Sequence, residues 1–328
     1  MTIMNVIDIL NVKMGFNIPL NRLFIIFLTL FFLSIFLFFL VRIIPGSPEM
    51  VILLQRGGII NTEELTNLRE ELGHNTSLFN QYIGWTMKII RFYFGTYYQS
   101  DLPVVEEIFS RINGTLLLAG PSLAISTLAG IIISFYAALY NGSRWDKWIG
   151  NISIFLSSLP NYLVGLLLVL IFSIHWKITP VYGNDTWLHF ILPIVTASLS
   201  LSAVFVQLFR QIIGEVIESL YFEAARARGL KNVVLYSRTL YLPCIHGFLT
   251  VIAANIGSLW GGIIVIETIF ARPGVGNYII HAVSVRAYPV IIGFTLIMAF
   301  FTMLIYLIID MLLRCIDPRQ KWKEGGRE

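Results

Sequence analysis

Residues 223–243 read EAARARGLKNVVLYSRTLYLP, a polar and basic stretch between two long apolar runs. Because Ala, Glu and Arg are good helix formers, the segment FEAARARGL, residues 222–230, is predicted to be helical, with Gly229 ending its last turn. The segment VVLYSRTLYLP, residues 233–243, can form a second short helix that ends near Pro243. The stretch therefore predicts a bent helical protrusion between two apolar segments.

The composition around this stretch is that of a membrane protein. Hydrophobic residues make up 56% of the 328 residues, charged residues only 13%, and the mean hydropathy is +0.77. A soluble domain carries roughly a quarter charged residues. The chain is therefore predicted to be an integral membrane protein with lipid as its main solvent. Its two cysteines, Cys244 and Cys315, lie near predicted cytoplasmic membrane edges, so a structural disulfide is not expected.

Apolar runs set the predicted topology. A spanning helix takes about 20 residues, and six runs are long enough: about 23–44, 113–140, 148–174, 188–209, 247–270 and 289–313. The first is expected to stay as a span, because RIIPGSP rather than a small-residue cleavage site follows it. The predicted fold class is an all-α integral membrane protein with six transmembrane helices and both termini on one side.

The distribution of Lys and Arg predicts on which side of the membrane the termini lie. If the N-terminus is cytoplasmic, the inside segments hold 14 of these residues and the two short outside loops hold three. This bias favours cytoplasmic termini. The predicted parts are a cytoplasmic segment 1–22, a first helix 23–44, an extracellular segment 45–112, a membrane core 113–313 with the protrusion 223–243, and a cytoplasmic tail 314–328.

The extracellular segment is predicted to hold two helices. NTEELTNLREELG, residues 61–73, has a cap residue at its start and Gly73 at its end. NQYIGWTMKIIRFYFG, residues 80–95, is predicted to be an amphipathic helix at the membrane interface, and its Trp85, Phe92, Tyr93 and Phe94 suit that depth. The alternative is a small folded cap with no role in binding a ligand.

Signatures of chemistry are missing from the sequence. It has no GxxxxGK[ST], HExxH or GxSxG motif, no Cys/His metal spacing and no paired-carboxylate constellation. No catalytic residue, bound cofactor, metal site or nucleic-acid partner is therefore expected. Five histidines are scattered, and the outward ones could ligate a metal or be merely solvated.

Ionisable residues at mid-membrane depth mark ion pathways, and they are scarce here. Arg210, Glu267 and Asp310 lie near span ends, where side chains can snorkel to water. This pattern predicts a conduit that takes its energy from elsewhere. Small residues recur in LAGPSLA, STLAG and GSLWGG, residues 118–124, 126–130 and 257–262. Such surfaces allow close helix packing, a bundle that moves as a unit, or a dimer seam, and the sequence leaves all three open.

The protrusion resembles the EAA loop of ABC-importer permease subunits, in which EAAxxxG is followed by LP. Glu223, Ala224, Ala225 and Gly229 match, and Leu242-Pro243 matches with the proline about one position late. In that family the loop docks into a groove on the ATPase subunit. The resemblance implies an ATPase-coupling role for Glu223, Ala224, Ala225, Arg226, Arg228, Gly229 and Pro243. The alternative is a basic loop that merely follows the inside charge bias.

Four further segments resemble the dipeptide/oligopeptide/nickel type of these permeases, and the long first outside segment indicates its B subunit. LGHNTSLFNQYIGW, residues 72–85, followed by FGTYY, residues 94–98, and PV, residues 103–104, resembles the outside segment of that type. VRIIPGSPEM, residues 41–50, resembles the exit of span 1, with Ser47 in place of the usual aspartate. VIETIFARPGVGNYIIHAVSVRAYPVIIG, residues 265–293, resembles the loop between spans 5 and 6, and DPR, residues 317–319, the usual ending. The departures are Arg238-Thr239 and Gly247, where the group often has an Arg-His pair and a later proline, and they can change the docking geometry slightly without changing the identity of the loop.

The resemblance implies a multi-pass permease of the bacterial cytoplasmic membrane. It would carry peptides, nickel or metal–chelate complexes that an extracellular solute-binding protein delivers. A second permease subunit of the C type and two ATP-binding subunits would complete it, and these ATPases would use the ATP and Mg. Residues at the outer mouth are expected to shape a gate or a receptor contact: Pro45, Gly46, Pro48, Glu267, Phe270, Pro273, Gly274 and Gly276. The rival hypotheses are a stand-alone secondary carrier, a membrane-embedded enzyme, and a permease coupled to an exporter-type ATPase.

Overall fold

The computed structural model describes residues 20–43, 77–97, 100–181, 183, 186–229 and 235–316. Within these ranges the chain is helical, apart from turns and one isolated β-bridge between Thr96 and Pro103. Five helices are long and apolar enough to cross a membrane, and a sixth span results if one bent pair counts as a span. The predicted class, an all-α integral membrane protein, is confirmed. The predicted number of six spans depends on the bent pair, and the cytoplasmic position of the termini stays a prediction.

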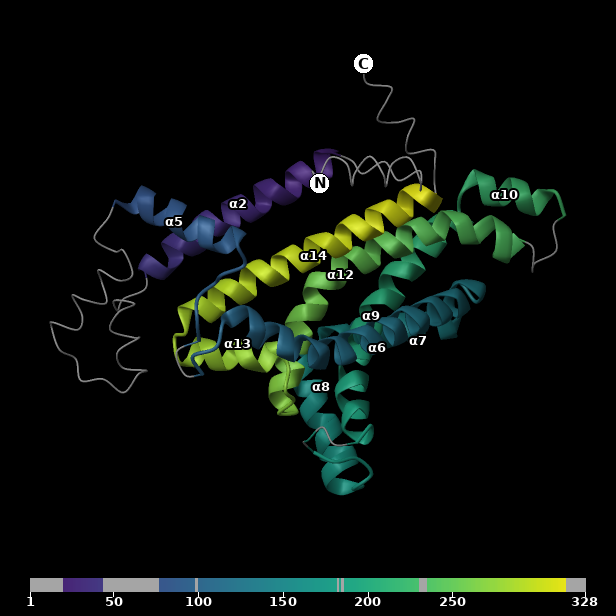
Figure 1. The fold of residues 1–328 in the computed structure, drawn as a ribbon. Coiled ribbons are helices and arrows are strands. Elements are labelled where there is room, and N and C mark those ends of the chain that lie inside the picture. Colours follow the sequence, from purple (N-terminus) through teal and green to yellow (C-terminus); the bar gives the residue numbers. More distant parts are fainter. Residues whose placement is uncertain are drawn as a thin grey trace, which may run out of the picture. The chain divides into compact units, whose positions relative to one another are not determined.

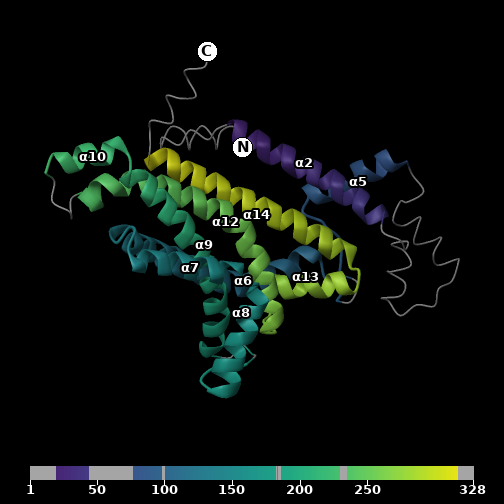
Figure 2. The same ribbon diagram turned by 180° about the vertical axis from the view of Figure 1, so that it is seen from behind.

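The chain divides into two compact units, each described here by itself (Figures 1 and 2). The first comprises residues 1–113 and 277–304, and the second comprises residues 114–276 and 305–328. The first contains α2 (Leu20–Ile43), α5 (Leu78–Ile90), the start of α6 (Val104–Leu139), most of α13 (Val275–Ser284) and most of α14 (Tyr288–Ile316). The second contains the rest of α6, the end of α14, and α7 (Arg144–Ser158), α8 (Asn161–Leu168), η1 (Val169–His175), α9 (Leu188–Ile217), α10 (Leu220–Ala227), η2 (Leu235–Leu240) and α12 (Tyr241–Ile269).

Five predicted spans coincide with single helices, α2, α6, α9, α12 and α14. The largest shift is in α6, which begins at Val104, nine residues before the predicted start at 113. Glu107 and Arg111 explain the difference, because they pair one turn apart and let the helix continue through charged sequence. The stretch 104–112 was predicted to belong to the extracellular segment, and it is the first part of this helix.

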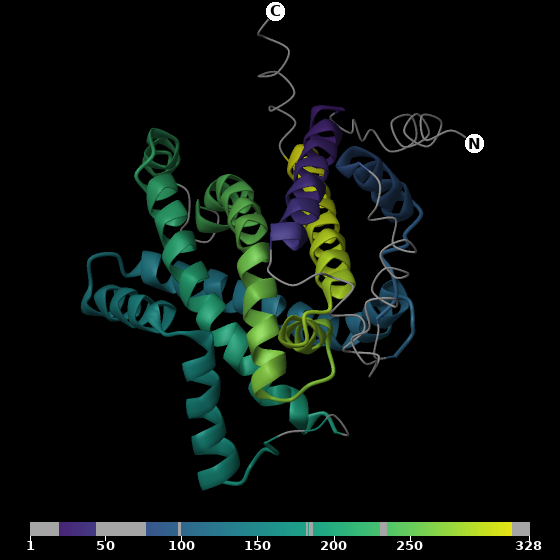
Figure 3. The ribbon, with the colours of Figure 1, turned by 90° about the vertical axis from the view of Figure 1, so that its left-hand side faces the viewer.

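The predicted third span, 148–174, is two helices rather than one. The segment Arg144–Ser158 meets the segment Asn161–His175 at an angle of 98°. The bend between them can be followed in Figure 3. Pro160 causes the break, since proline lacks an amide donor and forces the preceding residue out of the helical region. Leu159 accordingly has extended angles, φ −77° and ψ 129°.

In the first unit, α5 packs against the C-terminal half of α2. The Ser34 and Tyr82 hydroxyls are 2.9 Å apart, and the Phe38 ring meets the Tyr82 and Trp85 rings at 5.2 and 5.6 Å. Trp85, Ile89 and Phe94 also pack against a small cluster formed by Leu37, Ile292 and Leu296. The helix predicted within residues 80–95 is thus confirmed, whereas the helix predicted at 61–73 lies outside the described residues.

In the second unit, α6 meets α9 through small residues. The Ser126 hydroxyl donates to the Ser198 carbonyl at 3.1 Å. One turn further along, Gly130 faces Phe205 and Phe209, and a Cβ added there would lie 2.7 Å from Phe205 Cβ. In lipid, where no hydrophobic force drives helices together, such close approach is the main source of packing energy. The small residues of STLAG therefore serve helix packing within the chain. A Cβ added to Gly257 or Gly261, in contrast, would meet no other described helix or side chain within 4 Å.

The fit between α6 and α9 predicts a difference between two glycines of one helix. Gly130→Ala should lower the thermal unfolding midpoint relative to Gly120→Ala, because overpacking typically costs about 1–3 kcal/mol. Gly120 is the matched control, since nothing lies within 4 Å of its added Cβ and alanine gains the same helix propensity at both sites. Equal midpoints for the two purified variants would contradict the packing described.

Candidate functional site

Two regions carry the predicted functional residues: the protrusion, here the elbow (residues 219–243), and the turn after α12, here the outer corner (residues 267–276). In the elbow, Ser219 caps α10, its hydroxyl accepting from the Phe222 amide at 3.4 Å. The Gly229 amide donates to the Arg226 carbonyl at 3.0 Å. Gly229 has φ +71°, a left-handed conformation that glycine adopts without strain. The predicted helix and its glycine stop are both present.

The second elbow helix differs from the prediction. Residues Leu235–Leu240 form a π-helical turn that runs directly into α12, so the segment does not end near Pro243. Pro243 lies in the first turn of α12, where a missing amide donor is tolerated. Leu230–Val234 lie outside the described residues. The elbow therefore returns to the membrane as the start of a spanning helix.

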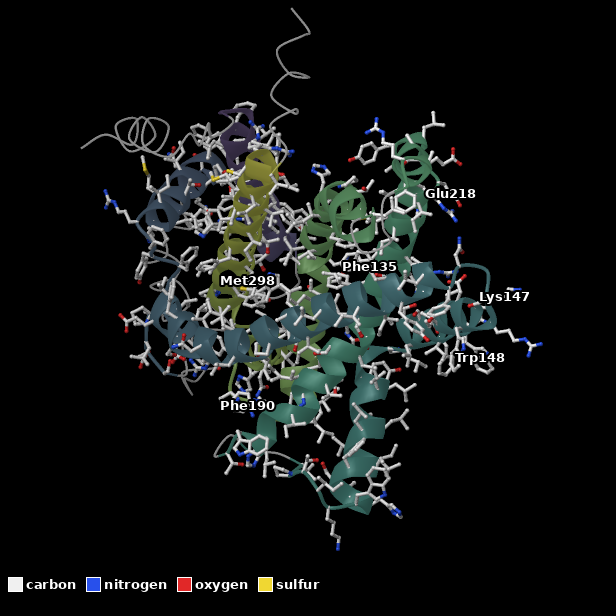
Figure 4. All side chains as sticks on the ribbon, turned by 90° about the vertical axis from the view of Figure 1, so that its right-hand side faces the viewer. Phe135, Lys147, Trp148, Phe190, Glu218 and Met298 are labelled. Atoms are coloured by element: carbon white, nitrogen blue, oxygen red, sulfur yellow. The ribbon has the colours of Figure 1, made fainter. Side chains whose placement is uncertain are left out.

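One face of α10 anchors the elbow. Phe222 and Ala225, one turn apart, are buried in the same apolar cluster as Phe209 and Ile213 of α9 and Leu240 of η2. Figures 1 and 2 show α10 next to the ends of α9 and α12. Glu218, the residue that ends α9 just before α10, is labelled in Figure 4. Because the anchor is shared with spanning helices, a force on α10 reaches α9 and α12 through packed side chains.

The other face of α10 is exposed. Glu223, Ala224, Arg226 and Arg228 all lie on it, while Ala225 of the same motif is buried. Two residues at the start of α10 were not predicted from the sequence to belong to this face. Leu220 is 83% exposed and Tyr221 is 62% exposed. Two large apolar side chains on a polar helix are a signal for a docking face, and the motif by itself did not include them. The exposed set brings the predicted coupling residues together, apart from Ala225 and Pro243.

An ion pair joins α9, the helix that leads to the elbow, to α7. Arg210 of α9 places Nε 2.7 Å from Asp146 Oδ1 and donates through Nη2 to Oδ2 at 2.8 Å. Asp146 also accepts from the Gly142 amide at 3.1 Å. Arg210, which the sequence places near a span end where it can reach water, binds a buried carboxylate of α7 while its side chain stays 37% exposed. The same first turn of α7 directs Lys147 and Trp148 outward (Figure 4).

The outer corner is built around Glu267, which is 0% exposed. Its carboxylate accepts from the Thr115 hydroxyl at 2.6 Å and from the Gly276 amide at 2.7 Å. Thr115 also accepts from the Val275 amide at 2.9 Å. A carboxylate suits this place, because the first amides of α13 carry the positive end of the helix dipole. Glu267 was predicted to snorkel, and it is instead enclosed by protein.

Glycines make the outer corner compact. A Cβ on Gly274 would overlap the Glu267 carboxylate, and a Cβ on Gly114 would overlap the Pro273 carbonyl oxygen. A Cβ on Gly276 would lie 2.6 Å from Ile264 Cα. The glycines of the PGVG motif are therefore required by close backbone approach.

The turn itself is fixed by a Schellman motif. Ala271 has φ +47°, the Arg272 amide donates to the Glu267 carbonyl at 2.8 Å, and the Ala271 amide donates to the Thr268 carbonyl at 3.3 Å. The Arg272 guanidinium donates to the Gly183 and His189 carbonyls and lies 3.7 Å from the centre of the Phe190 ring. Burial lowers the pKa of Arg272, and the nearby Glu267 carboxylate opposes that shift. Phe190 is labelled in Figure 4.

The outer-mouth prediction is only partly covered by the described residues. Pro45, Gly46 and Pro48 lie outside them. Glu267, Phe270, Gly274 and Gly276 are buried, and Pro273 is exposed. Their proposed part in a gate or a receptor contact stays a prediction, and the buried members could act there only by holding neighbours in place. Thr115 and Arg272 belong to this corner and were missed. An isolated threonine in NGTLLLAG was the only signal for Thr115.

Within the part of the chain that the structure describes, no group of three or more His, Cys, Asp or Glu residues could hold a metal ion. His281, one of the outward histidines, contacts the Tyr97 hydroxyl through Nδ1 at 3.1 Å.

Comparison with known proteins gives three findings. Residues 130–322 match the family described as the binding-protein-dependent transport system inner membrane component, and residues 16–119 match its N-terminal membrane component. The nickel import system permease protein NikB of Staphylococcus aureus strains USA300 and MRSA252 is 31% identical over 307 residues, covering 94% of this chain and 92% of that protein. A solved amino acid ABC transporter, crystallised with histidines, covers 64% of this chain at 19% identity, with a TM-score of 0.49. The first two findings confirm the resemblance drawn from the motifs.

The buried carboxylate of the outer corner generates a prediction. Glu267→Gln keeps the shape but turns one acceptor into a donor, which must face the Thr115 hydroxyl or the Gly276 amide. Leaving a buried donor unsatisfied costs about 1–3 kcal/mol. The thermal unfolding midpoint of the purified chain should therefore fall.

Thr268→Val is the matched control. Thr268 is the next residue, is exposed, and bonds only its own helix, at the Ile264 carbonyl 2.9 Å away. An unchanged midpoint for Glu267→Gln, or an equal loss for Thr268→Val, would contradict the account of the corner.

Proposed function

The chain belongs to the family of binding-protein-dependent transport system inner membrane components, and we propose that it carries nickel, as the ion or a chelate, for an ATP-driven importer. As a member of this family it is a permease subunit of an ABC importer, a multi-pass protein of the cell membrane and a transporter component rather than an enzyme. Support for nickel comes from the NikB relatives, which match along 94% of the chain. Short peptides are the alternative cargo.

Energy for transport is proposed to come from separate ATPase subunits. The exposed face of α10, with Leu220, Tyr221, Ala224 and Arg228, would seat in a groove on one of them. ATP and Mg would be used there, and this chain would bind neither. The buried face, with Phe222 and Ala225, would pass the movement to α9 and α12. Transport then follows from a two-state change that nucleotide biases.

The remaining partners are proposed because the chain belongs to this family of permease subunits. A second permease subunit of the C type would form the other half of the pathway, and a second ATPase would dock on it. An extracellular solute-binding protein would deliver the cargo and make most of the choice between nickel and peptide. The outer corner, through exposed Pro273, is a candidate for its contact.

The elbow assignment predicts the effect of one substitution. Gly229→Asp should reduce uptake in vesicles of the whole transport system to background, because a side chain would block close docking. The variant should still insert in the membrane, since aspartate tolerates a left-handed conformation better than most residues and nothing lies within 4 Å of the added Cβ.

Gly142→Asn is the control for this substitution. Gly142 is an exposed glycine at another left-handed turn, with φ +76° and open space around it, and asparagine avoids repulsion with Asp146. Normal uptake by Gly229→Asp would contradict the proposed coupling role of the elbow, whichever cargo is carried.

A second experiment decides the cargo. Cells lacking this chain should accumulate less radiolabelled nickel than the parent strain and take up a labelled dipeptide at an unchanged rate. The reverse result would replace nickel by peptide. Uptake by the purified chain in liposomes without any ATPase would instead favour the stand-alone carrier.

A further inference from the structure

We propose that α5 is embedded in one leaflet of the bilayer, with Phe79, Ile83, Met87 and Ile90 among the lipid acyl chains. The helix has 13 residues and a length of about 20 Å, too short to cross a hydrocarbon core of about 30 Å. Its side chains nevertheless divide into three faces, one packed on protein, one exposed and apolar, and one exposed and polar. The proposal follows from these faces and from the depth at which α5 meets α2.

The packed face fixes α5 to a membrane span. Tyr82, Trp85 and Ile89 recur every three or four residues and meet α2 or its small cluster with Ile292 and Leu296. Trp85 and Phe94 were two of the aromatic residues that the sequence predicted as interfacial anchors, and both pack on protein instead. The other two, Phe92 and Tyr93, are 67% and 48% exposed and follow the end of the helix, so within α5 itself other residues must meet the lipid.

The exposed apolar face supplies them. Phe79, Ile83, Met87 and Ile90 recur at helical spacing and are 41–71% exposed. In water, four large apolar side chains in one exposed stripe would be costly. Alongside them, α2 exposes Phe36, Phe39, Leu40 and Ile43. Since α2 is a spanning helix, its exposed flank is a lipid surface, and the stripe of α5 extends that surface.

The contacts with α2 set the depth. α2 has 24 residues and rises about 36 Å, slightly more than the hydrocarbon thickness. Ser34, which meets Tyr82, precedes the helix end at Ile43 by nine residues, about 13 Å. Phe38, whose ring meets those of Tyr82 and Trp85, precedes the same end by five residues, about 8 Å, so α5 meets α2 within the outer part of the core. Interfacial helices bury their apolar faces about 5–10 Å deep.

The polar face completes the match to a bilayer. Asn80, Gly84, Lys88 and Arg91 form a second exposed stripe along the whole helix, next to the apolar stripe. Lys88 and Arg91 have long side chains that can reach lipid phosphates while their stems stay in apolar surroundings. A partner protein would need an apolar groove beside a polar one, whereas the boundary of a phospholipid leaflet offers both. The occupant is therefore lipid.

Two neighbouring positions test the proposal. Spin labels are attached at Met87→Cys and, as the matched control, Lys88→Cys, after replacing Cys244 and Cys315, in the full chain in phospholipid vesicles. Collisions with oxygen, which dissolves in acyl chains, should be several-fold more frequent at residue 87, and collisions with water-soluble chromium oxalate several-fold more frequent at residue 88. Ile83→Cys and Gly84→Cys form a second pair if a label at 87 disturbs folding.

Two results would overturn the proposal. Chromium oxalate reaching residue 87 as readily as residue 88 would show that the stripe faces water. Exclusion of both reagents from residue 87 in membranes that contain the whole transport system would show that a partner protein covers it. Neither result bears on nickel uptake or on the elbow, so this test is independent of the proposed function.

Discussion

The burial of Phe222 against α9 and η2 is the contact on which the functional half of the molecule depends. A polar helix of eight residues has too little internal bonding to hold its shape in water. Phe222 and Ala225 give it an apolar face that joins the cluster around Phe209 and Ile213. That anchor leaves the opposite face, with Leu220 and Tyr221, exposed. A packed face and an exposed face thus come from opposite sides of one short helix.

α12 connects the elbow at its first turn with the outer corner at its last turn. It begins at the elbow, directly after the π-helical turn, and runs without a break to Ile269. Near that end Glu267 binds Thr115 of α6 and the Gly276 amide. A displacement at the first turn of α12 therefore reaches the outer corner along one continuous helix. Packed elements with two discrete arrangements are the usual carriers of such coupling.

Most of the architecture could be predicted from the sequence, because apolar length and glycine or proline stops are local signals. Five spans, the α5 helix and the stop at Gly229 follow from them. The 98° bend at Pro160 could not be placed, since a proline inside an apolar run permits either a kinked span or two helices. In the elbow, helix propensity identified α10, but Pro243 was taken as a stop, whereas it lies in a first turn, where proline is tolerated. At the outer corner, Thr115 and Glu267 are 152 residues apart, and no local pattern reports such a contact.

The buried carboxylates show why snorkelling was the wrong expectation for Glu267, whereas Arg210 keeps 37% of its side chain exposed beside Asp146. Water at a membrane edge is one way to satisfy a charge, and fixed donors are another. Among the described residues, Glu107 pairs with Arg111, Asp146 binds Arg210 and the Gly142 amide, and Glu267 binds a hydroxyl and an amide. Each of the last two pairs joins different helices, so its donors hold the bundle together. Removing one partner would leave a polar group unpaired in a low-dielectric place, so each of these contacts ties its two helices together. Among the described residues, Asp146 and Glu267 therefore join helices of the bundle.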